Sequence, residues 1–264
     1  MLPKNIAVVI MSRKRADSIL KNSLPLFPYA TVTVEESELD DYARVIPRKQ
    51  LLPHPHFDTL AELRNWIDDS HEQEFVYQVH DDLSKLMCLV GWRPRSYSDP
   101  SVVAQVLERI AICARDAGCF LFGPGNLVSA PQYRKMRPFR LNGYVRNVIG
   151  FRKGHGLRWD PATLGHHDVD IGLQALLAHR IIWRDERWQF VDARLASNAG
   201  GLSGIRTEDW LARGRRELSK KWGSRYVHFA ARRDWRTAEQ ATSTTEATVI
   251  TVSRRDRSVG PADQ

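Results

Sequence analysis

Two adjacent carboxylates, Asp81 and Asp82, directly follow an apolar segment, residues 75–80. The side chains of that segment alternate with the period of two that is typical of a β-strand. In α/β sheets, ligands bind at the carboxyl ends of strands, and carboxylates there favour a hard cation such as Mg²⁺ or Mn²⁺, which neutralises phosphates. The same pair also fits an acidic loop or a helix cap, so this segment alone leaves both interpretations open.

A second polar segment, Ser12 to Asp17, directly follows residues 6–11, which we expect to form another buried strand. Its cations and hydroxyl group stand where a nucleotide would meet an α/β sheet. The segment has neither the glycine spacing of a dinucleotide-binding turn nor that of a P-loop. This absence argues against dinucleotide oxidoreductases and P-loop kinases.

The composition predicts a folded protein that attracts polyanions. The 264 residues are 42% hydrophobic, which is ample for a core, and the three cysteines lack CxxC spacing, so we expect reduced, buried thiols. The formal charge of +8 and the pI near 9.6 come from basic segments that are interleaved with aromatic residues. Such segments fit a nucleic-acid surface, although solvated arginines on an ordinary basic enzyme give the same composition.

The order of the expected elements indicates an α/β fold with a doubly wound mixed sheet that is flanked by helices. Strands at 6–11, 31–34 and 75–80 alternate with helical segments from residue 19 and over 59–68, the latter with Asp58 as the candidate N-cap. Beyond them we expect helices at 102–117, 168–178 and 207–222, and strands at 119–122, 145–151, 181–183 and 188–191. A basic, proline-punctuated loop is expected at 127–143, where loops often cover sites.

Taken together, three of these segments resemble the nucleotide-sugar half of a GT-A glycosyltransferase: VIMSRKRADS at 9–18, LAELRNWI at 60–67 and VYQVHDD at 76–82. His80 stands where many relatives have the first carboxylate of the acidic motif. The resemblance implies that Asp82 holds Mn²⁺ or Mg²⁺. It also implies a nucleotide-sugar site that includes Ser12, Arg13, Arg15, Arg64, Asn65 and Asp81.

The second half of the chain extends the resemblance. GHHDVDIGLQ at 165–174 resembles the ED-type motif of these enzymes, with His167 in place of the usual Glu and Asp168 at the position of the catalytic base. NAGGLSGIRT at 198–207 and KWGSRYVH at 221–228 resemble segments of the phage and TET/JBP-associated glycosyltransferases. The resemblance adds Gly200 and Gly201 to the nucleotide-sugar site and His228 to the metal site. From the residues alone, Asp168 is equally an N-cap, and His228 equally a surface histidine at a strand end.

That family transfers sugars onto hydroxymethylated pyrimidines in DNA, so the resemblance implies transfer from a UDP-linked sugar to hydroxymethylcytosine or hydroxymethyluracil, with inversion and Asp168 as base. A base within a duplex would have to be flipped out. The expected DNA-binding residues are Tyr133, Arg134, Lys135, Arg137 and Arg140, although their loop also fits a solvated lid. A carbohydrate, lipid or protein acceptor, or a non-catalytic DNA-binding relative, is the alternative.

We expect one GT-A-like domain over residues 1–236, with the nucleotide-sugar half at 1–90 and the acceptor half at 91–236. Residues 237–264 contain little core-forming material and are expected to be a mobile tail. No signal sequence or membrane-spanning segment is recognisable, which predicts a cytoplasmic protein, in a phage-infected bacterium if the resemblance holds.

Overall fold

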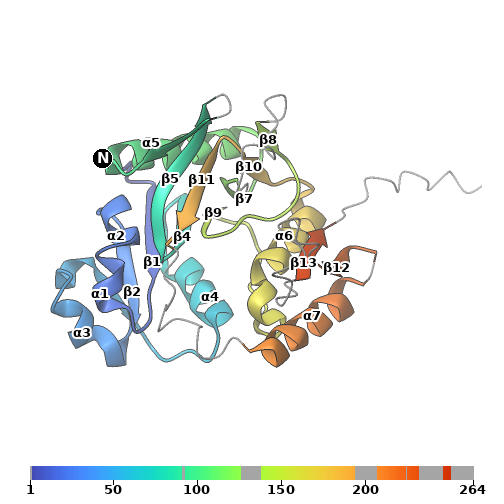
Figure 1. Cartoon of the computed structure of the whole chain (residues 1–264), viewed down its shortest axis with the longest axis horizontal. Coiled ribbons are helices and arrows are strands. Elements are labelled where there is room, and N and C mark those ends of the chain that lie inside the picture. The colour runs from blue at the N-terminus through green and yellow to red at the C-terminus, as the bar shows by residue number, and fades with distance from the viewer. Residues whose placement is uncertain are drawn as a thin grey trace, which may run out of the picture.

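A computed structural model describes residues 2–90, 93–125, 138–193, 207–223, 225–231 and 246–250. Its largest element is an eight-stranded sheet with the strand order β3-β2-β1-β4-β9-β7-β10-β8 (Figure 1). The strands are β1 (Ile6–Met11), β2 (Thr31–Glu35), β3 (Leu51–His54), β4 (Phe75–His80), β7 (Leu121–Pro124), β8 (Phe139–Arg140), β9 (Val148–Arg152) and β10 (Trp183–Asp185).

The first half of this sheet is parallel and the second half is mixed. β3, β2, β1 and β4 run parallel to one another, as the alternation of strands and helices predicts. β9 then pairs antiparallel with both β4 and β7, while β10 is parallel to β7 and antiparallel to β8. The expected α/β class and mixed doubly wound sheet are therefore confirmed.

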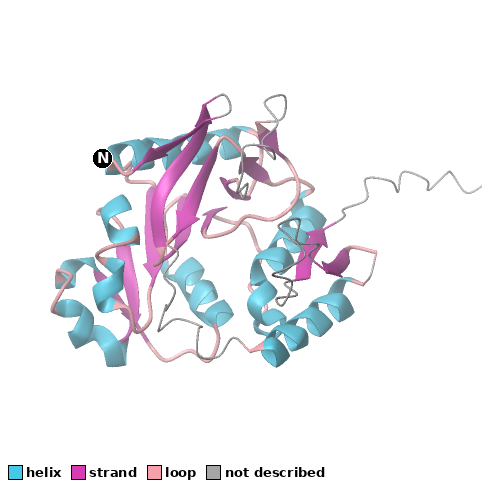
Figure 2. Ribbon diagram, viewed as in Figure 1, coloured by secondary structure: helices cyan, strands magenta, loops and turns pink. Residues whose placement is uncertain are grey.

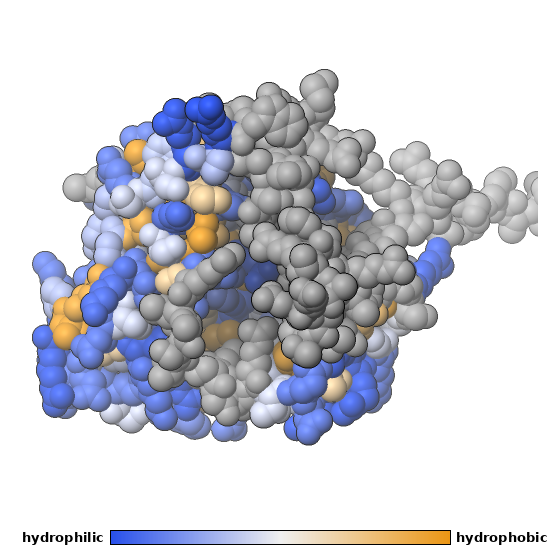
Figure 3. All heavy atoms as spheres, in the orientation of Figure 1, coloured by the Kyte–Doolittle hydropathy of each residue, from blue (hydrophilic) through white to orange (hydrophobic). Residues whose placement is uncertain are grey.

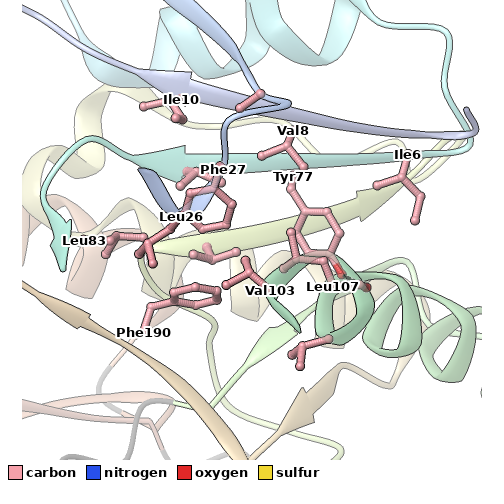
Figure 4. Close-up of a cluster of buried hydrophobic side chains, with 14 of the residues drawn as sticks. Ile6, Val8, Ile10, Leu26, Phe27, Tyr77, Leu83, Val103, Leu107 and Phe190 are labelled. Carbon is pink, nitrogen blue, oxygen red and sulfur yellow. Dashed lines mark hydrogen bonds between the residues drawn. The ribbon is translucent and has the colours of Figure 1, made fainter. Parts of the chain in front are cut away.

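Helices cover both faces of the sheet (Figure 2). On one face, the side chains of β1 and β4 pack against α5 (Pro100–Asp116), where Val103 and Leu107 are fully buried, and the Tyr77 hydroxyl donates a 2.6 Å hydrogen bond to the Leu107 carbonyl (Figure 4). On the other face, Val9 and Val76 pack against Ile67 of α4 (Leu60–Ser70). The alternating strand pattern thus divides its side chains between two helical layers.

The start of α4 corrects one expectation. Thr59, and not Asp58, is the N-cap: its hydroxyl accepts from the Glu62 backbone N–H, and the Glu62 carboxylate accepts from the Thr59 N–H at 2.8 Å. This reciprocal capping box satisfies two backbone donors that the helix itself leaves unpaired. A Thr followed by Glu at the third helical position is therefore a better start signal than the preceding aspartate.

A second, three-stranded sheet was not anticipated. It has the order β11-β5-β6 and is antiparallel throughout, with β5 at Leu83–Val90, β6 at Arg93–Tyr97 and β11 at Trp188–Asp192. The strand β6 is largely exposed and polar, so it lacks the apolar alternation that marks a half-buried strand. This sheet is what brings the end of β11 next to the acidic pair at the end of β4.

The C-terminal part of the described chain is built on α6 (His167–His179) and α7 (Glu208–Trp222). Val169 and Leu173 of α6, Leu218 of α7 and Val227 of β12 form a separate small core. β12 (Val227–Ala231) pairs antiparallel with β13 (Glu246–Ile250). This strand differs from the mobile tail expected at 237–264, and its run of β-branched residues explains why it pairs; the rest of that segment lies outside the described residues.

The remaining elements are short. They are α1 (Ala16–Ile19), α2 (Ser23–Leu26), α3 (Leu39–Ala43) and the 3₁₀ turns Glu36–Glu38, Arg48–Gln50 and Pro161–His166.

The cysteines are free thiols: Cys119 is buried, and Cys88 and Cys113 are half-buried. In the described part of the chain, no helix has the length and apolar character needed to cross a bilayer. Hydrophilic side chains dominate the described surface on the face shown in Figure 3.

Candidate functional site

The carboxyl ends of β1 and β4 lie side by side, because Met11 pairs with His80 in their parallel register. The residues that follow the two strands therefore meet. The Ser12 hydroxyl donates to Asp81 Oδ2 at 2.8 Å, and Arg15 Nη1 lies 2.7 Å from Asp81 Oδ1. Burial raises the pKa of Asp81, and the charge of Arg15 opposes that rise. Asp81 thus organises the loop after β1 and has both of its oxygens engaged.

The neighbouring Asp82 is differently placed. Its Oδ2 lies 3.7 Å from Arg15 Nη1, and 24% of its side chain is exposed, yet its Oδ1 is buried and has no hydrogen-bond partner. The backbone N–H of Ala193 donates to the Asp82 carbonyl at 2.5 Å, which holds the end of β11 against this residue. A buried acceptor atom without a partner costs the folded state free energy that a hydrogen bond or a bound cation would offset.

Asp192, the last residue of β11, is a second carboxylate at the same place. Asn147 Nδ2 donates to its Oδ1 at 2.7 Å, and the Asn147 carbonyl accepts from the His80 N–H at 2.9 Å. Partial burial raises the pKa of Asp192, and the negative charge of Asp82 raises it further. Sequence patterns did not single out Asp192, because its proximity to Asp82 arises only from the pairing of β11 with β5.

Asp82 and Asp192 have the hard oxygen ligands that Mg²⁺ or Mn²⁺ prefers. A bound cation would give the unpaired Asp82 Oδ1 a partner. It would also favour the ionised form of Asp192, whose pKa is raised. Among the described side chains, however, no three His, Cys, Asp or Glu groups are assembled around one point. The backbone of His228 lies in β12, opposite Val249, but its side chain lies outside the described part, so its metal role stays a prediction.

The Arg64–Asn65 pair lies in α4 behind the end of β4. Arg64 is only 3% exposed, its guanidinium lies 4.2 Å above the Trp159 ring, and its Nη2 lies 3.0 Å from His80 Nε2. Asn65 exchanges two hydrogen bonds with the backbone of Trp159, at 2.9 and 3.0 Å. Arg64 therefore reaches the acidic end of the sheet, whereas Asn65 ties α4 to the segment that leads into α6.

Burial lowers the pKa of His80 to about 3, and the charges of Arg64, Arg146 and Arg15 act in the same direction. His80 is therefore neutral. Among these three arginines, Arg64 is the one in direct contact with the His80 ring.

Asp168 is the second residue of α6. The N-cap is His166, so Asp168 is not the cap, although its Oδ1 accepts from the Val169 N–H at 3.0 Å. Burial raises the pKa of Asp168, and the charges of Arg146, Arg64 and His166 oppose the rise. Arg146 Nε lies 3.9 Å from its Oδ2, and 26% of the Asp168 side chain is exposed. A partly accessible carboxylate with a raised pKa is suited to accept a proton.

Two adjacent residues before β9 contact two of these carboxylates. Arg146 Nε lies 3.9 Å from Asp168 Oδ2, and the next residue, Asn147, donates to Asp192 Oδ1 at 2.7 Å. This short segment therefore lies between the start of α6 and the end of β11. Arg146 is not among the site residues expected from the sequence.

The other predicted site residues are more dispersed. The Arg13 side chain is 37% exposed and lies 3.9 Å from the Glu35 carboxylate. Arg140, in β8, is 45% exposed and lies 3.3 Å from the buried carboxylate of Glu186. The remaining predicted residues, Tyr133, Arg134, Lys135, Arg137, Gly200 and Gly201, lie outside the described residues.

Comparison with known proteins finds one matching family and several similar solved structures. Residues 6–201 match the family described as TET-Associated Glycosyltransferase. The structure of S. aureus TarS 1–349 in complex with UDP-GlcNAc aligns at a TM-score of 0.51 and 12% identity, over 82% of this chain and 66% of that one. TarS 1–349 without that ligand aligns at 0.44 and 12% identity, over 70% and 59%. The chain thus spans less than two thirds of either TarS chain. No curated protein sequence matches.

Proposed function

The chain belongs to the TET-associated glycosyltransferase family, and we propose that it moves a sugar from a UDP-linked donor to the hydroxyl of a hydroxymethylated pyrimidine in DNA. It is a glycosyltransferase with a GT-A-type fold. The observation that carries the proposal is the pair Arg146 and Asn147, which contact the base candidate Asp168 and Asp192 respectively.

In the proposed reaction, Asp168 accepts the proton of the acceptor hydroxyl while the hydroxyl oxygen attacks the anomeric carbon. The bond from that carbon to the diphosphate breaks, and the configuration inverts because attack and departure occur on opposite faces. Burial raises the pKa of Asp168, so its carboxylate is a stronger base than an exposed aspartate. Arg146, which lies 3.9 Å away, keeps the carboxylate oriented and ionised.

The donor site is proposed at the ends of β1 and β4. Ser12 and Arg15 are fixed by Asp81, so the loop that meets the nucleotide is already ordered before binding. Arg15 and Arg64 supply positive charge for the departing diphosphate. Where a divalent cation is bound, Asp82 and Asp192 are the described carboxylates that would hold it, and it would offset the same developing charge.

A DNA acceptor is supported by the family description and by the net charge of +8. The complex of TarS with UDP-GlcNAc, a nucleotide sugar, supports a donor of that class. The cytoplasm of a phage-infected bacterium is the proposed setting. The sugar and the modified base are left to experiment.

The test is transfer of label from a panel of UDP-sugars to matched duplexes that carry cytosine, hydroxymethylcytosine or hydroxymethyluracil. We expect label only on a hydroxymethylated duplex. Asp168→Asn should slow transfer by roughly 10²–10⁴-fold, while Asp116→Asn, which alters an exposed carboxylate at the end of α5, should leave it unchanged. Hydrolysis of a UDP-sugar without transfer to any DNA, or transfer to a carbohydrate, lipid or protein acceptor instead, would refute the DNA acceptor.

A further inference from the structure

The outer face of α7 carries three cations, Arg213, Arg216 and Lys220, which we name the α7 row. They follow one another at spacings of three and four residues, so their side chains lie on one face of the helix. All three residues are exposed, and within the part of the chain that the structure describes none of them forms an ion pair. The buried residues of α7, Gly214 and Leu218, lie on the opposite side. The three charges therefore face solvent.

The α7 row is unfavourable for the helix itself. Arg216 has a like charge on each side, Arg213 three residues before it and Lys220 four residues after it, and like charges at such spacings repel. On another face of the same helix, Arg215 forms an ion pair with Glu208. Helix stability alone would favour such alternation of signs along an exposed face. An anionic partner gives the α7 row a physical reason.

The spacing of the α7 row fits the backbone of a nucleic acid. Arg213 and Lys220 are seven residues apart in the helix, which corresponds to a rise of about 10 Å. One strand of a DNA duplex carries roughly one charge per 3.4 Å of helix axis, which is about three charges over the same length. A helix that lies along the duplex could therefore place one cation near each of three successive phosphates.

The position of α7 brings this surface beside the proposed transfer site. A Cβ on Gly165 would lie 2.8 Å from the Trp210 ring, and one on Gly214 would lie 2.9 Å from the Thr163 carbonyl oxygen, so α7 is in close contact with the chain before α6. The first turn of α6 follows directly and holds the proposed base Asp168. A duplex bound on the outer face of α7 would therefore lie next to that base.

Resting on the proposed function, we propose that the α7 row is a docking surface for the phosphate backbone of the acceptor duplex. Contacts to phosphates fix the position of a protein on a duplex without reading its sequence. The α7 row thus holds the DNA while the modified base is presented to the site. This surface is additional to the DNA-binding residues expected from the sequence, which lie between residues 133 and 140.

Two triple variants with the same loss of charge isolate this surface. The first is Arg213→Gln, Arg216→Gln and Lys220→Gln, in which glutamine retains a high helix propensity. The control is Arg93→Gln, Arg95→Gln and Arg109→Gln, at exposed positions of β6 and α5 that also form no ion pair with any described residue. Figure 1 shows α5 at the top of the molecule and α7 at the bottom, and β6 pairs with the end of β5 that is remote from Asp192.

Fluorescence anisotropy with a short unmodified duplex, measured over a range of KCl concentrations, provides the test. We expect the slope of log K against log [KCl] to be shallower by about 2–3 for the α7 variant, because each lost phosphate contact removes roughly 0.9 from it. At moderate salt its affinity should be at least about tenfold below that of the control variant. Affinity for a hydroxymethylated duplex should fall by the same factor, because the backbone is common to both duplexes.

Equal salt slopes for the two variants would overturn the inference, and so would a loss of binding to anionic lipid vesicles with no loss of binding to DNA. Transfer to hydroxymethylated DNA with the same KM for both variants would keep the proposed function and overturn the inference. DNA binding that depends on the α7 row, without transfer of sugar to any DNA, would support the docking surface and contradict the proposed function. A protein that neither binds nor modifies DNA would overturn both.

Discussion

Lys221 Nζ lies 2.9 Å from Oδ1 of Asp170, a carboxylate with no exposed surface. The same carboxylate accepts from Trp222 Nε1 at 2.7 Å and from Gln174 Nε2 at 2.7 Å, and Lys221 also reaches Asp160 at 2.7 Å. The second aspartate of the ED-type motif, Asp170, and the adjacent Lys221 and Trp222 of the KWG segment therefore form one network around a buried carboxylate. It fixes α7 to the helix that carries Asp168.

We predict that Asp170→Ala destabilises the protein by about 3–5 kcal/mol, because it leaves a lysine and an indole N–H without their buried acceptor. Urea unfolding followed by circular dichroism measures the change. Lys220→Ala, which alters the exposed neighbour of Lys221, should shift the free energy of unfolding by less than about 0.5 kcal/mol. A small effect of Asp170→Ala would contradict the anchoring role.

Asp168→Asn should lower kcat by roughly 10²–10⁴-fold while UDP still binds, because the amide cannot accept a proton. In the unaltered protein, burial raises the pKa of Asp168, so kcat should fall on acidification at a higher pH than the ordinary aspartate range predicts. A pH–rate profile measures this fall. A profile that stays flat down to the ordinary aspartate pKa would argue against Asp168 as the base.

The same variant should raise the Tm at neutral pH. A folded-state pKa above the unfolded value means that folding disfavours the ionised carboxylate, so stability is greatest below the unfolded pKa and is lost as pH rises through the folded one. Asparagine removes that loss. Thermal unfolding at pH 7.5 tests the expectation, and a lower Tm would mean that the attraction between Asp168 and its arginines outweighs the cost of burial.

Asp68 offers a second dependence on pH. Burial raises the pKa of Asp68 to about 7, against the hydrogen bond from Gln78 and the charges of Arg64 and Arg158. Asp68 Oδ2 and Gln78 Oε1 are both buried acceptors without a partner, and protonation turns the former into a donor. Stability should therefore decrease between about pH 4 and 7 and level off above that range.

Asp68→Asn should remove this slope, so its advantage in Tm over the unaltered protein should grow between pH 4 and 7, to on the order of 5 °C. Differential scanning calorimetry across that range provides the measurement. Asp69→Asn, at the exposed neighbouring carboxylate, is the matched control. If the Tm of the unaltered protein and that of Asp68→Asn change with pH by the same amount, burial does not raise the pKa of Asp68.

Gly172 allows a close approach between α6 and the chain before β9. A Cβ at this position would lie 2.9 Å from the Gly143 carbonyl oxygen and 3.1 Å from the Tyr144 Cβ. Gly172→Ala should therefore destabilise the protein by about 1–3 kcal/mol and also reduce kcat, because α6 carries Asp168. Leu177→Ala, at a 61% exposed position of the same helix, should leave both quantities nearly unchanged. An unchanged Tm and kcat for Gly172→Ala would refute the packing argument.

The sequence by itself determined the elements whose signals are local. The apolar alternation in β1 and β4, and the helical spacing in α4 and α5, are set by residues a few positions apart, and the structure has all four near the expected ranges. The meeting of Ser12 and Arg15 with Asp81 followed in the same way, because the ends of adjacent parallel strands share one edge of the sheet.

Tertiary structure alone decided which distant groups share the site. Asp192 lies near Asp82 because β11 pairs with β5, which is about 100 residues earlier in the chain. The third strand of that sheet, β6, is polar and exposed, so it lacks the apolar alternation by which a strand is recognised in a sequence. Arg146 and His80 gained their significance in the same way, from the carboxylates and arginines packed around them. The periodicity of apolar residues shows which side of a helix or strand is buried. Which element packs against that side depends on the tertiary structure of the whole chain. The same packing determines which charged side chains come close enough to interact.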